Sequence, residues 1–254
     1  MRFLLTRRWV LFGLAVALLA LLCVRLGEWQ FHRLHDREQS NAWTRANLKA
    51  PPAPVDDVLS VDRDVPDDRI WTPVKATGTY DASATIVLRY QSRNGRSGID
   101  LVTPLVTDSG AALLVDRGWM STPNTGAMPT DPPAPPAGRV TVAGYVQVDN
   151  PPVSATAVTD HSTRAISTRM IARNLSHPVY RGYIAATSET PPPSRRLVPV
   201  QQPDLGNGPH LFYGIQWWFF AALAVFGFGY LIRDEMRKKP VSAGKESPTP
   251  AVHT

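Results

Sequence analysis

One histidine stands at the beginning of an apolar segment, where it could hold a metal centre. His210 immediately precedes residues 211–232, which contain neither a charged residue nor a proline. Neutral imidazole is a common axial ligand of haem iron, and a site near the bilayer surface would leave a lipophilic porphyrin tail in lipid. The alternative is an interfacial histidine that anchors the helix or hydrogen-bonds a loop, since polar aromatic residues are enriched at that depth. The position of His210 alone favours the anchoring role, and the role of iron ligand stays open.

Two tryptophans follow in the same segment. Trp217 and Trp218 could flank a bound macrocycle, or they could belong to an aromatic belt at the membrane interface. Gln216 is polar near the start of an apolar run, so we expect it to find a hydrogen-bond partner. Tyr213, Gln216 and Trp217 would share a helix face, which could meet another helix, a cofactor or a partner protein.

Two further motifs have a chemical and a structural interpretation. His32 and His35 lie three residues apart, as a metal pair on a helix would, but His-x-x-His without a third ligand favours a solvated helix face. Residues 116–119, Asp-Arg-Gly-Trp, end a buried-looking strand, and the Asp and Arg could pair across a turn there. They form either a partner-docking corner or an ordinary corner of the domain.

Composition excludes several classes of protein. The net charge is +6, but the basic residues form no stripe with interleaved aromatics, so we expect no nucleic-acid partner. Cys23 is the only cysteine, which excludes an intramolecular disulfide, a Cys-x-x-Cys site and a multi-thiolate zinc site. The sequence has no hydrolase elbow, phosphate loop or dinucleotide fingerprint. Residues 40–208 therefore supply no recognisable catalytic constellation.

Two apolar segments would position these residues. A bilayer core of about 30 Å needs roughly 20 residues at about 1.5 Å each, so the segment from His210 is long enough to span. Residues 9–24 form a second, shorter run. It could be a cleaved signal peptide, but no small-x-small site follows it, and we interpret it as an uncleaved anchor helix.

Flanking charge predicts the orientation of these spans. Basic residues precede the first and follow the second: Arg2, Arg7, Arg8, Arg233, Arg237, Lys238 and Lys239. The positive-inside rule then places both termini in the cytoplasm. Arg25, Arg33 and Arg37 oppose this rule, but long loops translocate largely regardless of charge, so the central segment should lie outside.

The residue pattern of the central segment predicts a β-rich domain. Residues 27–39 should continue the first helix out of the membrane, and prolines at 51, 52 and 54 should end it. Alternation and β-forming residues predict strands at 72–80, 85–90, 99–106, 112–119, 139–148 and 179–187. We expect a turn at 92–98, a proline-rich loop at 122–138 and a short helix at 167–175.

Four motifs occur in order along the chain. They are Gly27-x-Trp29-Gln30-x-x-Arg33; Gly78-Thr-Tyr-Asp81 with Arg89 and Gly95-x-x-Gly98; Thr103-Pro-Leu105 with Leu114-Val-Asp-Arg-Gly-Trp119; and His210-Leu-x-Tyr213-x-x-Gln216-Trp217. Together with the span–loop–span layout, they resemble the Surfeit locus protein one family of cytochrome c oxidase assembly factors.

The resemblance implies a non-enzymatic protein that helps to mature subunit I of haem-copper oxidases and, in bacteria, binds haem a. The family's proposed iron ligand corresponds to His210, and the tryptophan after it corresponds to Trp217. This sequence departs from the family's pattern at three places: Gly214 replaces the usual alanine, Asp116 replaces the common asparagine, and Gly208-Pro209 precedes the histidine where asparagine is expected.

We therefore expect an α+β membrane protein with two transmembrane helices flanking a β-rich extracytoplasmic domain. The expected parts are a cytoplasmic N-terminus (1–8), a span (9–28), the β-rich domain (29–209), a second span (210–232) and a disordered cytoplasmic tail (233–254). In a bacterial-type cell membrane, it would bind haem a through His210 and Trp217 and promote insertion into subunit I, with haem a synthase as a further possible partner. The alternatives are a haem-independent scaffold for an oxidase assembly intermediate and an external enzyme tethered by two helices.

Overall fold

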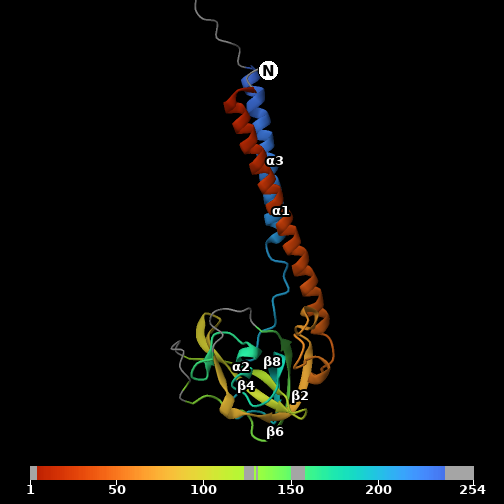
Figure 1. The fold of residues 1–254 in the computed structure, drawn as a ribbon, viewed down its shortest axis with the longest axis vertical. Coiled ribbons are helices and arrows are strands. Elements are labelled where there is room, and N and C mark those ends of the chain that lie inside the picture. Colours follow the sequence, from red (N-terminus) through yellow and green to blue (C-terminus); the bar gives the residue numbers. More distant parts are fainter. Residues whose placement is uncertain (1–4, 123–128, 130, 150–157, 238–254) are drawn as a thin grey trace, which may run out of the picture. The chain divides into compact units, whose positions relative to one another are not determined.

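The structure, a computed structural model, describes residues 5–122, 129, 131–149 and 158–237. It divides into two compact units, Met1–Glu38 with Asn207–Thr254, and Gln39–Gly206. The first unit contains most of two long helices, and the second is built on a large sheet (Figure 1). The predicted mixed α+β class is confirmed.

The second unit contains one eight-stranded sheet. Its strands are β1 Ala53–Pro54, β2 Pro73–Tyr80, β3 Ile86–Arg93, β4 Arg96–Thr107, β5 Ala112–Ser121, β6 Arg139–Gln147, β7 Ser162–Thr163 and β8 Val179–Thr190. Short 3-10 turns cover Val55–Asp57, Asp67–Arg69 and Ala82–Ala84, and the helix α2 covers Thr168–Ala172. Each predicted strand is therefore present, with ends that differ by a few residues.

Five of these strands close into a ring. β2 pairs with β6, β6 with β8, β8 with β5, β5 with β4, and β4 with β2 again. Only the β5–β8 pair of this ring is parallel. Gly78 pairs with both β4 and β6, and a Cβ at this position would collide with the carbonyl oxygen of Val106. The ring closes there because glycine lets two backbones approach closely.

The inside of this barrel holds the main hydrophobic core. Alternate residues of each strand point inward, as period-two geometry requires. The core residues include Val74, Ala76, Tyr80, Leu105, Leu113, Val115, Val140, Val142, Val146, Ile184 and Ala186. A second cluster on the outer face of β3, β4 and β5 packs under Ile166 and Ile171, the latter from α2. The predicted β-rich domain is thus a closed barrel with one covered outer face.

Two local features differ from the prediction. The predicted turn is present at Asn94 and Gly95 but is shorter than residues 92–98, because β3 runs to Arg93 and β4 begins at Arg96. Residues 116–119 are not a corner, because they lie within β5 and pair with β4 and β8. Parts of the predicted 122–138 loop and the tail after residue 237 lie outside the described residues.

Helix α1, Arg7–Asn47, is longer than either apolar segment required. The predicted continuation through residues 27–39 is confirmed, and the helix stops before the prolines at 51 and 52. Its last turns belong to the barrel unit, where Asn41 and Arg45 donate hydrogen bonds to the carbonyl of Leu205 at 3.1 and 2.8 Å. Asn47 donates to the carbonyls of Asp68 and Ile70.

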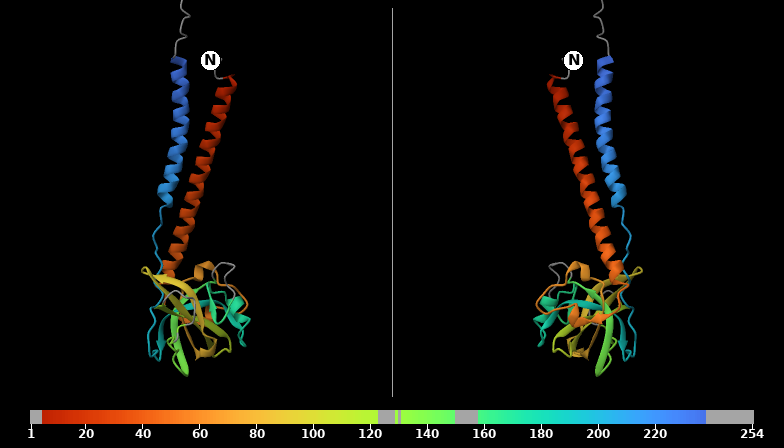
Figure 2. Two further views of the ribbon diagram at one scale, coloured as in Figure 1. Left: turned by 90° about the vertical axis from the view of Figure 1, so that its left-hand side faces the viewer. Right: turned by 90° about the vertical axis from the view of Figure 1, so that its right-hand side faces the viewer.

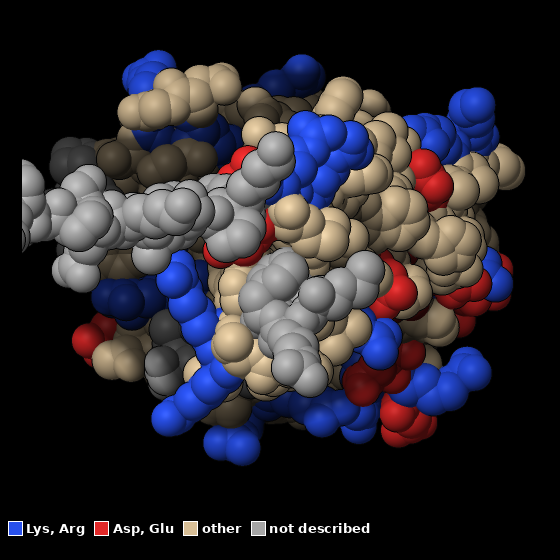
Figure 3. All heavy atoms as spheres, turned by 90° about the horizontal axis from the view of Figure 1, so that it is seen from above, with Lys and Arg blue, Asp and Glu red and all other residues tan. Residues whose placement is uncertain are grey.

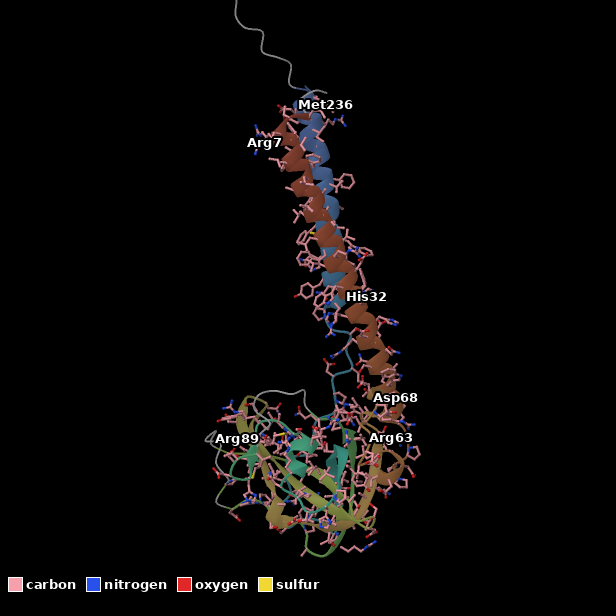
Figure 4. The ribbon with its side chains drawn as sticks, in the orientation of Figure 1. Arg7, His32, Arg63, Asp68, Arg89 and Met236 are labelled. Atoms are coloured by element: carbon pink, nitrogen blue, oxygen red, sulfur yellow. The ribbon has the colours of Figure 1, made fainter. Side chains whose placement is uncertain are left out.

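Helix α3, His210–Arg237, pairs antiparallel with the first part of α1. Figure 4 labels Arg7 and Met236 at the same end of the pair, and Figure 2 shows the two helices side by side in further views. Both helices are long and apolar enough to cross a membrane. By length, therefore, both predicted spans are present as helices.

The contact between these helices follows a heptad. Most of the less exposed positions alternate at intervals of four and three residues, the pattern of coiled-coil packing. These positions are Trp9, Gly13, Val16, Ala20, Cys23, Gly27, Gln30 and Leu34 in α1, and His210, Gly214, Trp217, Ala221, Ala224 and Phe228 in α3. Many are small, as expected where helices pack closely in lipid.

The closest approach lies at two glycines. A Cβ on Gly27 would collide with the indole of Trp218 and stand 3.2 Å from the carbonyl oxygen of Gly214. A Cβ on Gly214 would stand 2.9 Å from the ring of Phe31, which itself lies 4.8 Å from Trp218 between ring centroids. Two aromatic rings therefore fill the space that these glycines leave open.

We predict that Gly27→Ala weakens the helix pair by about 1–3 kcal/mol, because the added methyl overpacks this crossing. Alanine favours a helix over glycine by about 1 kcal/mol, so a net loss would reflect packing alone. The measurement is unfolding of the detergent-solubilised protein in increasing SDS, followed by circular dichroism. Gly229→Ala is the matched control, since a Cβ there meets nothing within 4 Å. Equal behaviour of the two variants would contradict the prediction.

Candidate functional site

His210 is the first residue of α3 and lies half-buried against α1. Its Nδ1 is 2.9 Å from Oε1 of Gln30. Tyr213 donates its backbone N–H to the carbonyl of Pro209 at 3.1 Å, which forms the first turn of the helix. The imidazole is therefore held by a side chain on the other helix and does not simply extend into the surroundings.

The residues before His210 leave space next to its second ring nitrogen. Gly208 has φ of 66°, a left-handed conformation that glycine and asparagine adopt most readily. A side chain at this position would bring its Cβ to 3.7 Å from Nε2. Within the described part of the chain, Nε2 has no hydrogen-bond partner. One ring nitrogen is thus anchored, and the other remains available to a ligand.

Trp217 lies two turns after His210 on the same face of α3, about 10 Å along the helix axis. It is half-buried, and its ring packs edge-on against Phe220 at a centroid distance of 6.0 Å. Trp218 instead fills the crossing with α1, against Gly27 and Phe31. The two tryptophans therefore have different surroundings, which the sequence alone could not distinguish.

The other candidate side chains do not join this site. His32 and His35 are exposed, and Figure 4 labels His32 on α1. No group of three or more metal-ligating side chains occurs among the described residues. Gln216 and Tyr213 are also exposed. The residue that sequence reasoning did not assign to the site is Gln30, although it belongs to the first family-like motif.

A model described as the SURF1 family matches residues 17–222 of this chain. The chain belongs to the SURF1 family. It is 29% identical to a SURF1-like protein of Mycobacterium tuberculosis over 252 residues, which cover 97% of this chain and 92% of the relative. It is 31% identical to a SURF1-like protein of Rickettsia felis over 114 residues, 44% of this chain and 47% of the relative.

Family membership implies a general role in cytochrome oxidase assembly. Together with the two apolar helices, it indicates a membrane protein. SURF1 proteins are assembly factors and are not known as catalysts. His210 therefore belongs to a membrane protein with a general role in oxidase assembly.

The surface of the barrel unit carries charges of both signs. Figure 3 shows Lys and Arg side chains interspersed with Asp and Glu on the face seen there. Arg169 and Arg181 both pair with Asp64, at 2.9 and 3.2 Å. A neighbouring cavity of about 580 Å³ is lined by these residues together with Arg173 and Asp149. Several basic side chains of this SURF1 protein are thus locally balanced by carboxylates.

Two carboxyl groups lie buried side by side in the barrel wall. Asp100 on β4 and Asp116 on β5 are only 4% and 7% exposed. Burial raises the pKa of Asp100 to about 6, although Arg93 at 2.8 Å opposes this shift. Burial, together with the charge of Asp100, raises the pKa of Asp116 to about 7, while a hydrogen bond from the Gly118 N–H opposes the shift.

Asp116 and Arg117 do not pair with each other, contrary to the expectation from their sequence. Their side chains point to opposite sides of β5 because successive residues of a strand alternate. Arg117 pairs with Glu189 at 2.9 Å and donates to the carbonyls of Pro133 and Ala134. Tyr80 donates to the same Glu189 carboxylate at 2.6 Å. Because the side chains of Tyr80, Arg117 and Glu189 are buried, the observed arrangement supports a structural role.

These raised pKa values predict that the barrel becomes less stable as pH rises from about 4 to about 7. An unfolded Asp has a pKa near 3.8, so in this window the folded state binds more protons than the unfolded state. The stabilisation is complete below the window and lost above it. The measurement is the Tm of the detergent-solubilised protein at pH 5, 6, 7 and 8.

Asp116→Asn should flatten this pH dependence and raise the Tm at pH 8. Asparagine keeps an acceptor for the Gly118 N–H and removes the buried charge. Asp67→Asn, which changes an exposed carboxylate, is the matched control and should leave the slope unchanged. A Tm that rises with pH across the window would overturn the prediction.

Proposed function

We propose that this SURF1 protein binds haem a at the outer face of the membrane and promotes its insertion into subunit I of cytochrome c oxidase. His210 would be the axial ligand of the iron. The observation that carries the proposal is the held imidazole: Gln30 engages Nδ1, and Gly208 leaves space beside Nε2. The Nδ1 contact alone would also suit an interfacial anchor, and the space beside Nε2 is the feature that a metal ligand requires.

The location suits the cargo. Haem a is amphiphilic, so a site at the mouth of a membrane helix can bind the ring while its lipophilic tail stays in lipid. His210 begins the apolar helix α3, and Trp217 lies on the same face further into it. We propose that Trp217 contacts the macrocycle. A single imidazole ligand also suits a carrier, because its bond to iron can exchange during transfer.

The orientation is also a proposal. The antiparallel α1 and α3 place Arg7 and Arg8 at the same end as Arg233 and Arg237. The positive-inside rule would put this end in the cytoplasm and His210 at the other face. The barrel would then lie outside the cytoplasm, where it could meet subunit I and haem a synthase.

The first test is the optical spectrum of the full-length protein purified from cells that make haem a. We expect near-stoichiometric haem a in the wild type and its loss in His210→Ala, because the iron would lose its protein ligand. His35→Ala is the matched control, since His35 is an exposed histidine of α1 and should keep full occupancy.

Unchanged haem a content in His210→Ala would remove this histidine from the ligand role. If the wild type lacks haem a while oxidase subunits still co-purify, the protein acts as a haem-independent scaffold for an assembly intermediate. Binding of haem a by the wild type without any subunit I would contradict the insertion role.

The second test concerns orientation. Replacing the buried Cys23 by Ala gives a background without thiols, into which single cysteines can be introduced. Ala82→Cys on the barrel should react with a membrane-impermeant maleimide in intact spheroplasts. Met236→Cys, at the end of α3, should react only after the membrane is opened; both positions are exposed. The reverse pattern would overturn the proposed topology.

A further inference from the structure

We propose that Gln30 is a positioning residue that makes Nε2 of His210 the iron ligand and moderates the strength of that bond. This inference rests on the proposed haem function and assigns a role to a residue on the opposite helix. Its observation is the 2.9 Å contact between Oε1 of Gln30 and Nδ1 of His210.

The chemistry of the two groups determines the tautomer. An amide oxygen only accepts hydrogen bonds, so the Nδ1 that faces it must carry the proton. A neutral imidazole has one N–H, and its other nitrogen then holds the lone pair. Nε2 is therefore the nitrogen that can bind iron, and it is also the one next to the space at Gly208.

The fold holds Gln30 in place from both sides. Three residues before it, Gly27 forms the close crossing with α3, and the next residue, Phe31, packs on Trp218. Towards the other end of the contact, Asn207 donates to Glu38 at 3.1 Å and so fastens the segment that leads to His210. The backbone on each side of the contact is therefore held, which keeps the Gln30 amide within reach of the imidazole.

The neutrality of the acceptor has a consequence for cargo release. A carboxylate on Nδ1 strengthens a metal-bound histidine, since it draws the proton and raises the basicity of the ring. An amide orients the ring in the same way but draws the proton less strongly. Gln30 thus gives a defined geometry with a bond of intermediate strength, which suits a protein that must pass its haem on.

The experiment compares Gln30→Leu and Gln30→Glu in the full-length protein loaded with haem a. The readouts are the rate of haem transfer to apomyoglobin and the midpoint potential of the bound haem. Loss of a partner for a metal-bound histidine costs about 10–100-fold in affinity, so Gln30→Leu should release haem faster by about that factor. Its potential should shift in the positive direction, because the less basic ring stabilises ferric iron less.

Gln30→Glu should do the opposite, with slower release and a negative shift of the potential. Gln39→Leu is the control, since Gln39 is an exposed glutamine on the same helix and should leave both readouts unchanged. If Gln30→Leu does not accumulate, the direction of the Gln30→Glu shift decides the question alone.

Shifts of both variants in the same direction would indicate a packing role and overturn the inference, as would faster release from Gln30→Glu. Release rates and midpoint potentials equal to those of the wild type in both variants would also overturn the inference. If the Gln30 variants contradict the inference in this way while His210→Ala still loses haem, the proposed haem function stands. Only the positioning role of Gln30 is then wrong. If His210→Ala keeps its haem, both fail together.

Discussion

The close crossing of α1 and α3 is the constraint on which the histidine site depends. Two glycines let the backbones approach, and Phe31 and Trp218 fill the space between them. In lipid, helices gain little from burying apolar surface, so close packing of small residues has to replace the hydrophobic effect. The same heptad that carries these glycines also carries Gln30 and His210. The hydrogen bond between them is therefore a consequence of the register of the pair.

The barrel unit depends on strand pairing and on paired buried charges. Five strands close into a ring, so the ring has no free edge that could pair with another chain. Its wall contains buried ionisable groups that are costly without partners, and most have them: Arg117 pairs with Glu189, and Asp100 with Arg93. Asp116 lacks a positively charged partner as close as these, and burial together with the charge of Asp100 raises its pKa. These groups contribute to the shape of the domain, whereas the ligand chemistry proposed for this SURF1 protein resides in the helices.

Much of the architecture could be predicted because it depends on local patterns. Alternation of apolar residues located β2 and β6, whose inner faces fill the barrel, and β-forming residues with turn signals located β4, β5 and β8, all to within a few residues. Length and hydropathy located both long helices. The pattern failed where pairing extends a strand through polar residues, as at Arg93 and Arg96 in the β3–β4 hairpin. It also failed at Asp116 and Arg117, where the alternation of a strand separates neighbours that a turn would bring together.

The amino-acid order alone was sufficient to establish the family, the two apolar helices and the β-rich domain between them, because each depends on residues close together in the chain or on motifs in a fixed order. It also singled out His210 as the candidate ligand. It could not show that Gln30, 180 residues earlier, meets this histidine. Nor could it show that β2 pairs with β4 to close the barrel, or that Asp100 and Asp116 are buried as neighbours. These three features arise from contacts between segments far apart in sequence, and such contacts exist only once helices have packed and strands have found their register.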